Sequence, residues 1–155
     1  MIPKIEFLDK TKKKKLLNQL EECYGIEDMK YLLISSGKDK FRIFSGNLSK
    51  DELNELAKNI YIEMIGARLC TLAENNIRLN FDIMNLPEIK KQITKNVVEI
   101  NDEQLLIWLK GGNPEVEPKI KAKFIAVKHN GDFIGIARNR ETFLKNYVPK
   151  ERRVK

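Results

Sequence analysis

The side chains with the clearest chemical potential in this chain are the lysines and arginines of its last quarter. Eleven of them, against three acidic residues, lie between Lys119 and Lys155, although the formal net charge of all 155 residues is only +7. A concentrated positive field of this kind attracts polyanions, above all the phosphates of a nucleic acid. The alternative is an ordinary solvated surface on a basic protein, and charge by itself leaves both interpretations open.

The basic residues fall into three groups that could converge on one surface. The first group alternates with apolar residues, which predicts a strand with its lysines on one face. The second group, Arg138 and Arg140, lies on one side at the end of the following strand. The third group, from Lys150 to Lys155, closes the chain in a strand-like segment. We predict an RNA-binding surface made of Lys119, Lys121, Lys123, Arg138, Arg140, Lys150, Arg152, Arg153 and Lys155.

Aromatic residues lie close to these lysines and arginines in the sequence. Phe143 and Tyr147 could stack on exposed bases of RNA, whereas the alternation around Phe133 favours a place in the core. Phosphate contacts would make the binding salt-sensitive and weakly selective for sequence.

Signatures of enzymes are mostly absent from the sequence. It contains neither a glycine-rich phosphate loop nor a G-x-S-x-G nucleophile motif. His129 is the only histidine and falls in a predicted turn, while Cys23 and Cys70 are isolated from each other. We therefore expect no catalytic residue, no metal site, no cofactor and no disulfide.

The composition bounds the class of protein. A hydrophobic content of 42% supports a buried core, and 33% charged residues point to a well-solvated surface. No apolar run approaches the roughly 20 residues that cross a bilayer, and the first residues lack the core of a signal peptide. We expect a cytoplasmic protein with no membrane partner.

The first part of the chain alternates between helical and strand patterns. A helix over residues 9–24, stopped by Gly25, is followed by a hairpin of residues 30–35 and 40–45, and Ser49 with Glu52 opens a second helix through a capping box. Beyond that helix we predict a strand over residues 61–66, a second strand from there to Leu72, and a third over residues 77–81. A short helix then begins at Pro87.

The later part is richer in strands. We predict a short strand over residues 97–100, a helix capped at Asn101 and ended by Gly111 and Gly112, and strands over residues 119–128 and 133–138. An Asn-Gly pair joins the last two strands, and this pair is a strong hairpin signal. The change in character suggests a domain boundary near residues 94–96 and an α+β fold: a mixed domain with an antiparallel sheet, then a small domain like a β-barrel.

The segment VVEINDEQLLIWLKGGNPEVEPKIKAKFIAVKHNGDFIGIARNR resembles a PUA domain, the RNA-binding module named for pseudouridine synthases and archaeosine transglycosylases. The shared pattern is an opening strand, a capped helix ending in Gly-Gly, a connector, a hydrophobic strand and an N-G-D hairpin. With RLNFDIMNLPEI before it, the chain is similar to an archaeal and eukaryotic ribosome-biogenesis family that joins a pre-PUA domain to a C-terminal PUA domain. The resemblance implies a pre-PUA domain over residues 1–94 and a PUA-like domain over residues 95–155.

The same resemblance implies a function. The protein would be a non-enzymatic RNA-binding factor in biogenesis of the large ribosomal subunit and processing of its precursor rRNA. Its ligand would be U- or AU-rich RNA and its partners ribosome-assembly or RNA-processing proteins, with the family's terminal bases at Arg152, Arg153 and Lys155. Two alternatives stay open: an accessory RNA-binding subunit of an RNA-modifying enzyme, and a protein-interaction adaptor that binds through its first domain.

Overall fold

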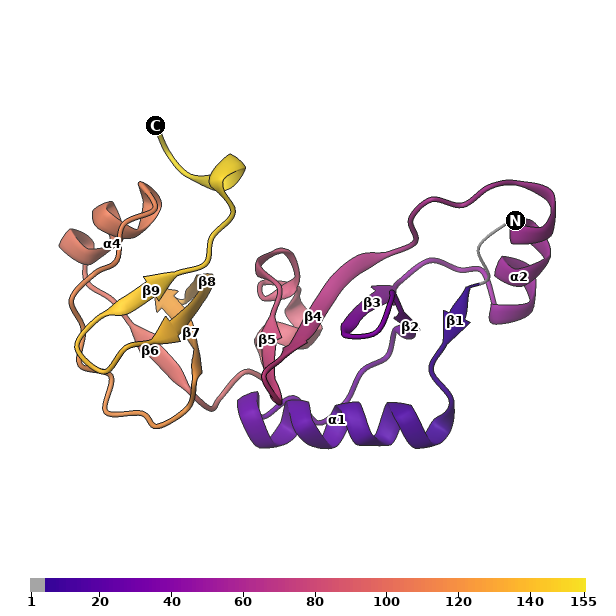
Figure 1. Cartoon of the computed structure of the whole chain (residues 1–155), viewed down its shortest axis with the longest axis horizontal. Coiled ribbons are helices and arrows are strands. Elements are labelled where there is room, and N and C mark those ends of the chain that lie inside the picture. Colours follow the sequence, from indigo (N-terminus) through magenta and orange to yellow (C-terminus); the bar gives the residue numbers. More distant parts are fainter. Residues whose placement is uncertain (1–4) are drawn as a thin grey trace.

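The computed structural model of the chain describes residues 5–155, which form two β-sheets that follow one another along the sequence (Figure 1). The first sheet has five strands in the order β1-β2-β3-β4-β5, and the second has four in the order β6-β7-β8-β9. Helices pack on these sheets, so the predicted α+β class, with an antiparallel first sheet, is confirmed.

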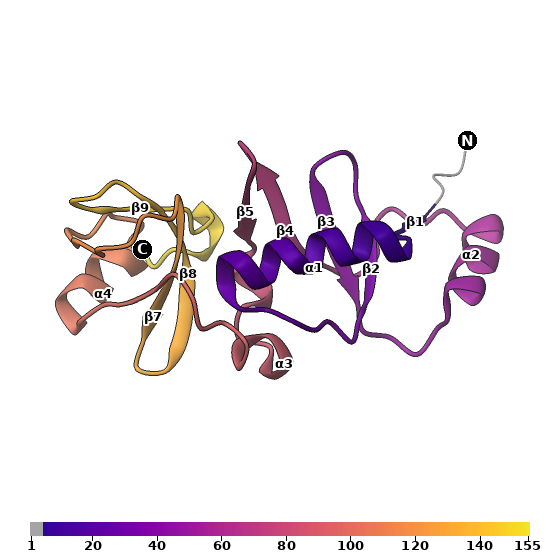
Figure 2. The same ribbon diagram turned by 90° about the horizontal axis from the view of Figure 1, so that it is seen from below.

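All neighbouring strands of the first sheet are antiparallel, and helix α1 (Lys10–Tyr24) lies along one of its faces (Figure 2). Asp9 caps the start of α1 by accepting a hydrogen bond from the Lys12 amide, and Gly25, with φ of 87°, ends it in the left-handed conformation. The predicted first helix is therefore confirmed. The strands are β1 (Glu6–Phe7), β2 (Leu32–Ser35), β3 (Lys40–Phe44), β4 (Ala67–Ala73) and β5 (Asn76–Leu79).

The predicted hairpin of β2 and β3 and the second helix, α2 (Lys50–Asn59), are also confirmed, with both hydrogen bonds of the capping box present at Ser49. A predicted strand over residues 61–66 is wrong, because strand structure begins only at Ala67. The side chain of Arg42 explains the difference. Its guanidinium donates to the carbonyls of Ile65 and Gly66, at 3.0 and 2.9 Å. These two carbonyls are therefore occupied and do not accept the backbone hydrogen bonds that a strand over these residues would require.

Two short elements end the first part of the chain. Strand β5 stops at Leu79, earlier than predicted, because the Asn80 side chain caps the 3₁₀ turn η1 (Phe81–Ile83). Helix α3 (Pro87–Lys90) follows with proline in its first turn, as predicted.

The second sheet combines one parallel and two antiparallel pairings: β6 runs parallel to β7, whereas β7, β8 and β9 are antiparallel neighbours. Asn130 and Gly131, with φ of 46° and 86°, form the tight turn between β7 and β8, which confirms the predicted hairpin. The elements are β6 (Val97–Glu99), α4 (Asp102–Leu109), β7 (Phe124–His129), β8 (Asp132–Asn139), β9 (Leu144–Asn146) and the 3₁₀ turn η2 (Lys150–Arg152).

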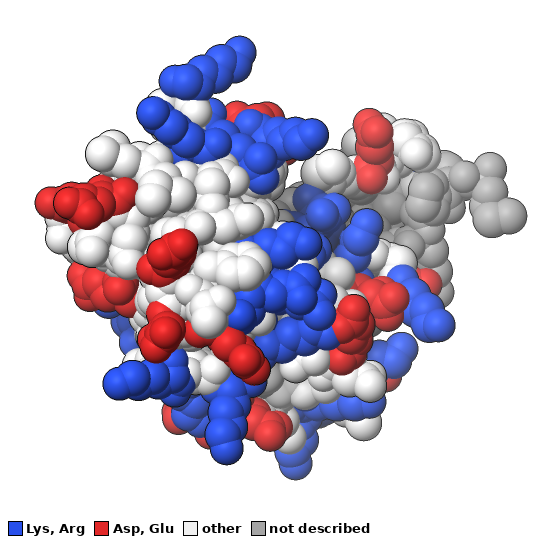
Figure 3. All heavy atoms as spheres, turned by 60° about the vertical axis from the view of Figure 1, so that its left-hand side comes forward, with Lys and Arg blue, Asp and Glu red and all other residues white. Residues whose placement is uncertain are grey.

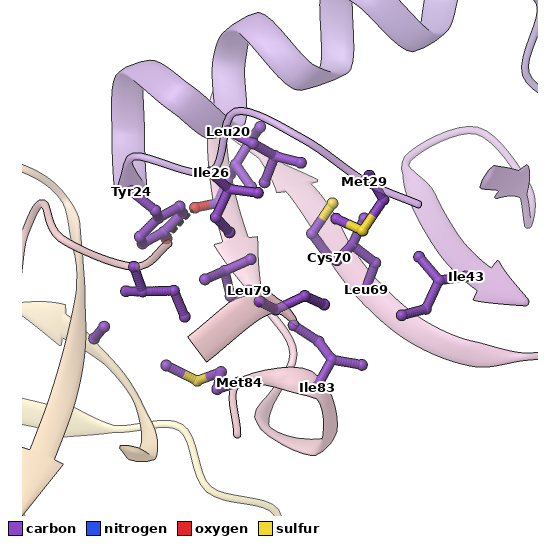
Figure 4. Packing of buried hydrophobic residues seen from close by; sticks show 14 of the residues in the cluster. Leu20, Tyr24, Ile26, Met29, Ile43, Leu69, Cys70, Leu79, Ile83 and Met84 are labelled. Carbon is purple, nitrogen blue, oxygen red and sulfur yellow. Dashed lines mark hydrogen bonds between the residues drawn. The ribbon is translucent and has the colours of Figure 1, made fainter. Parts of the chain in front are cut away.

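The two sheets share one buried core. Figure 4 shows Leu20 and Tyr24 of α1 packed over Leu79, with Met84 beneath them. The same cluster contains residues of β7 and β8 from the second sheet, namely Phe124, Ala126, Phe133 and Ile136. Asn85 reinforces the contact, because its side chain both donates to and accepts from the backbone of Phe133, at 2.7 and 2.9 Å.

Cys70 in this core should make folding stability fall at alkaline pH. Burial raises the pKa of its thiol from an ordinary 9.0 to about 12, so the unfolded thiol ionises first and stability present below pH 9 is lost as pH rises toward 12. The loss should approach about 1.4 kcal/mol per pH unit. Burial also raises the pKa of Tyr24, which steepens the decline at higher pH.

Cys70→Ala should flatten this slope, and urea unfolding followed at pH 8, 9.5 and 11 measures it. Cys23→Ala is the comparison: burial also raises the pKa of this partly buried thiol, but less than that of Cys70, so the slope should change less. A slope that Cys70→Ala leaves unchanged would contradict the prediction.

Candidate nucleic-acid interface

The basic end of the chain is held by the fold. A predicted strand-like conformation is wrong, because residues 150–152 form η2. The Asn146 side chain donates to the carbonyl of Trp108 and accepts from the amide of Val148, which turns the chain toward α4. The amide of Val154 then donates to Leu109 at 2.8 Å. The end is therefore an ordered segment docked on α4.

Two of the predicted terminal bases serve contacts within the protein. Arg153 Nε donates to the carbonyl of Val148 at 3.1 Å, and its side chain lies on Gly111, where a Cβ would approach Arg153 Cδ to 2.4 Å. Arg152 Nη2 lies 2.9 Å from Asp82 Oδ1, which links η2 to η1 of the first part. Lys150 and Lys155 remain exposed at this end.

The predicted lysine-bearing strand is also wrong. Lys119 has φ of 53°, in the left-handed region, and β7 begins only at Phe124. The side chain of Asn139 binds the carbonyls of Ile120 and Ala122, so this stretch is an anchored connector. The three lysines therefore do not share one strand face. Lys119 and Lys121 are exposed on the connector, whereas Lys123 is half-buried and points toward the first sheet.

Arg138 and Arg140 are likewise separated by the structure. Arg138 lies in β8, directly opposite Phe124 of β7 and Lys145 of β9, so these three side chains share one face of the sheet. Arg140 lies beyond the end of β8, in the exposed turn before β9, and does not share that face.

Lysine and arginine side chains gather around Tyr147 where the two sheets meet. Arg78 of β5 places its Cζ 5.1 Å from the centre of the Tyr147 ring, and Lys145 of β9 places its Nζ 5.9 Å from it. Cations at these distances are attracted to an aromatic ring. Figure 3 shows Lys and Arg gathered near the middle of the face it presents, flanked by acidic side chains. We define the junction cluster as Arg78, Lys123, Arg138, Lys145 and Tyr147.

One acidic residue enters the junction cluster. The carboxylate of Glu74, at the turn between β4 and β5, forms an ion pair with Lys123 and lies 3.9 Å from Arg138 Nη2. Sequence reasoning included Lys123 and Arg138 but missed Arg78 and Lys145. The outward place of Arg78 in the alternation of β5 was a usable signal, although nothing in the sequence indicates which sheet lies opposite it.

The prediction that His129 lies in a turn is wrong, because its backbone pairs with Asp132 and only Asn130 and Gly131 form the turn. His129 is the last residue of β7, and its Nε2 lies 2.8 Å from Asp102 Oδ1 at the start of α4. Between residues 5 and 155, no three His, Cys, Asp or Glu side chains are arranged to hold a metal ion. No helix within the same range is long and apolar enough to cross a membrane.

Comparison with known proteins identifies the second sheet and its helices. Residues 95–154 match the family model of the methyltransferase RsmF PUA domain. No curated protein matches the chain. The matched range begins just before β6 and continues past η2, so it includes α4 and the second sheet. The chain thus contains a PUA domain of the RsmF type at residues 95–154.

Proposed function

We propose that this protein binds RNA through its PUA domain. The observation that carries the proposal is the match of residues 95–154 to a PUA family, because the PUA domain is a non-catalytic RNA-binding module. The excess of eleven basic over three acidic residues between Lys119 and Lys155 supplies the positive field that phosphates require. Most of these bases lie inside the matched range.

For the biological role we propose a non-enzymatic factor that acts on precursor rRNA of the large ribosomal subunit in the cytoplasm. Support comes from the resemblance of the chain to the ribosome-biogenesis family with a pre-PUA domain. By the same resemblance, the RNA is U- or AU-rich and the partners are ribosome-assembly or RNA-processing proteins.

The second candidate is an accessory RNA-binding subunit of an RNA-modifying enzyme. The observation that favours it is the kind of PUA domain, because the matching family model describes that of a methyltransferase. Crosslinking of the full chain in cell extract, with identification of bound RNA and proteins, separates the two. Precursor rRNA with assembly factors supports the first, and a modifying enzyme with its substrate RNA supports the second. Protein partners without RNA would instead indicate an adaptor.

The exposed lysines of the connector should contribute to RNA affinity. Replacing Lys119 and Lys121 by Gln in the full chain removes two exposed cations, so affinity for a labelled oligouridine should fall about tenfold. The slope of log affinity against log salt should become shallower by about 1.4, at roughly 0.7 per phosphate contact on single strands. Fluorescence anisotropy over a series of KCl concentrations measures both quantities.

Lys12→Gln with Lys14→Gln is the matched control. Both lysines are exposed on α1, so this variant has the same net charge as the connector variant. Equal losses in the two variants would show that only total charge matters, which is the solvated-surface alternative.

A further inference from the structure

The acidic side chain that contacts the junction cluster, that of Glu74, indicates what kind of ligand the cluster binds. We propose that the junction cluster binds a backbone phosphate of single-stranded RNA, and that the Glu74 carboxylate occupies the place of that phosphate in the unbound protein. This inference rests on the proposed function, because it requires that the protein binds RNA. It goes further in two respects: Arg78 of the first sheet takes part in binding, and loss of the Glu74 charge strengthens binding.

Glu74 is placed by the backbone of a tight turn. Glu74 and Asn75 have φ of 51° and 63°, and the paired residues Ala73 and Asn76 close the turn between β4 and β5. The Asn76 side chain also donates to the carbonyl of Glu74 at 2.8 Å. The turn therefore presents the Glu74 side chain to the PUA domain without burying it.

The cations are held more firmly than the anion. The side chains of Lys123 and Arg138 are 23% and 28% exposed, whereas that of Glu74 is 65% exposed. A half-buried cation is costly to leave without a negative partner, but an exposed carboxylate is well solvated by itself. An incoming phosphate can therefore replace the Glu74 carboxylate as the partner of Lys123 and Arg138, and the released carboxylate is then solvated by water. Guanidinium groups bind carboxylates and phosphates through the same fork of donors.

The other half of the junction cluster suits a polynucleotide better than a small anion. Arg78 and Lys145 lie against the Tyr147 ring and come from different sheets, so the positive surface extends across the junction. Among residues 5–155, the ion pairs of the Glu74 carboxylate are with Lys123 and Arg138, and none is with Arg78 or Lys145. A flexible single strand can place successive phosphates along such a surface, with stacking available from an aromatic or guanidinium plane.

Glu74→Gln tests the inference because it removes the competing charge and keeps the size of the side chain. We expect the full-length variant to bind oligouridine about five- to tenfold more tightly than wild type, in line with two weak ion pairs released. The salt dependence should become steeper, since more counterions are displaced. Glu99→Gln is the control, because it removes the same charge from an exposed site on β6. Strand β6 and strand β9, which carries Lys145, form the two opposite edges of the second sheet.

A further variant locates the effect. Adding Arg78→Gln and Lys145→Gln to Glu74→Gln should return affinity to the wild-type value or below, with the fold checked by circular dichroism. If wild type binds oligouridine but Glu74→Gln matches Glu99→Gln, this inference is wrong and the proposed function stands. If wild type binds no RNA at all, the proposed function itself fails. Inorganic phosphate that competes as well as oligouridine, compared per phosphate, would overturn the assignment to RNA.

Discussion

Trp108→Ala should destabilise the PUA domain by about 3–5 kcal/mol and abolish RNA binding under mild denaturing conditions. Trp108 is 1% exposed and belongs to the buried cluster that α4 forms with the second sheet. Its indole Nε1 donates to the carbonyl of Ile134 at 2.9 Å. Gly135 of β8 fits against the ring, since a Cβ there would lie 3.0 Å from Trp108 Cζ2. The substitution removes both the packing and the hydrogen bond.

Two further variants make this result specific. Trp108→Phe keeps an aromatic ring but leaves the Ile134 carbonyl without its donor, so a loss of about 1–3 kcal/mol is expected. Leu106→Ala, on the same helix but 63% exposed, should cost little. Urea unfolding followed by circular dichroism is the measurement, because Trp108 is the only tryptophan available for fluorescence. Equal stabilities of Trp108→Ala and Leu106→Ala would refute the prediction.

Phe133→Ala should have a comparable effect by opening the junction between the sheets. Phe133 is buried in the core that the two sheets share, and its backbone makes both hydrogen bonds to Asn85. We expect a loss of about 3–5 kcal/mol from the large cavity. Because the lost contacts join the sheets, unfolding should also become less cooperative, with the two parts melting separately.

Calorimetry compared with circular dichroism detects this change, as the ratio of calorimetric to van't Hoff enthalpy should rise above one. Phe143→Ala is the matched control, because Phe143 is only half-buried and lies outside the shared core. A single transition with an unchanged ratio in Phe133→Ala would show that the sheets remain coupled without this side chain.

Elements whose signals are local could be predicted from the sequence. Capping boxes at Ser49 and Asn101, and the turn at Asn130 and Gly131, act within a few residues and have the expected geometry. Two of the wrong strand predictions, over residues 61–66 and over the lysines before Phe124, failed because of distant side chains. Arg42 and Asn139 bind the carbonyls that a ladder would have used, and neither contact can be inferred from local periodicity.

The candidate interface was predictable in composition but not in arrangement. The excess of bases after Lys119 is visible in the sequence. Their grouping depends on how β8, β9 and β5 meet, which brings Arg138 and Lys145 together and adds Arg78 from the first sheet. The same tertiary contacts direct Arg152 and Arg153 into bonds within the protein.

The shared core also constrains how the nascent chain can fold. A ribosome releases α1, β5 and η1 well before β7 and β8, so Leu79 and Met84 leave the exit tunnel without the PUA strands that complete their burial. The core of the first sheet therefore stays partly open until β7 and β8 have also left the ribosome. A pause in translation at the stage when η1 has left the exit tunnel but β7 has not would prolong the exposure of this apolar surface and give chaperones a defined interval in which to bind it.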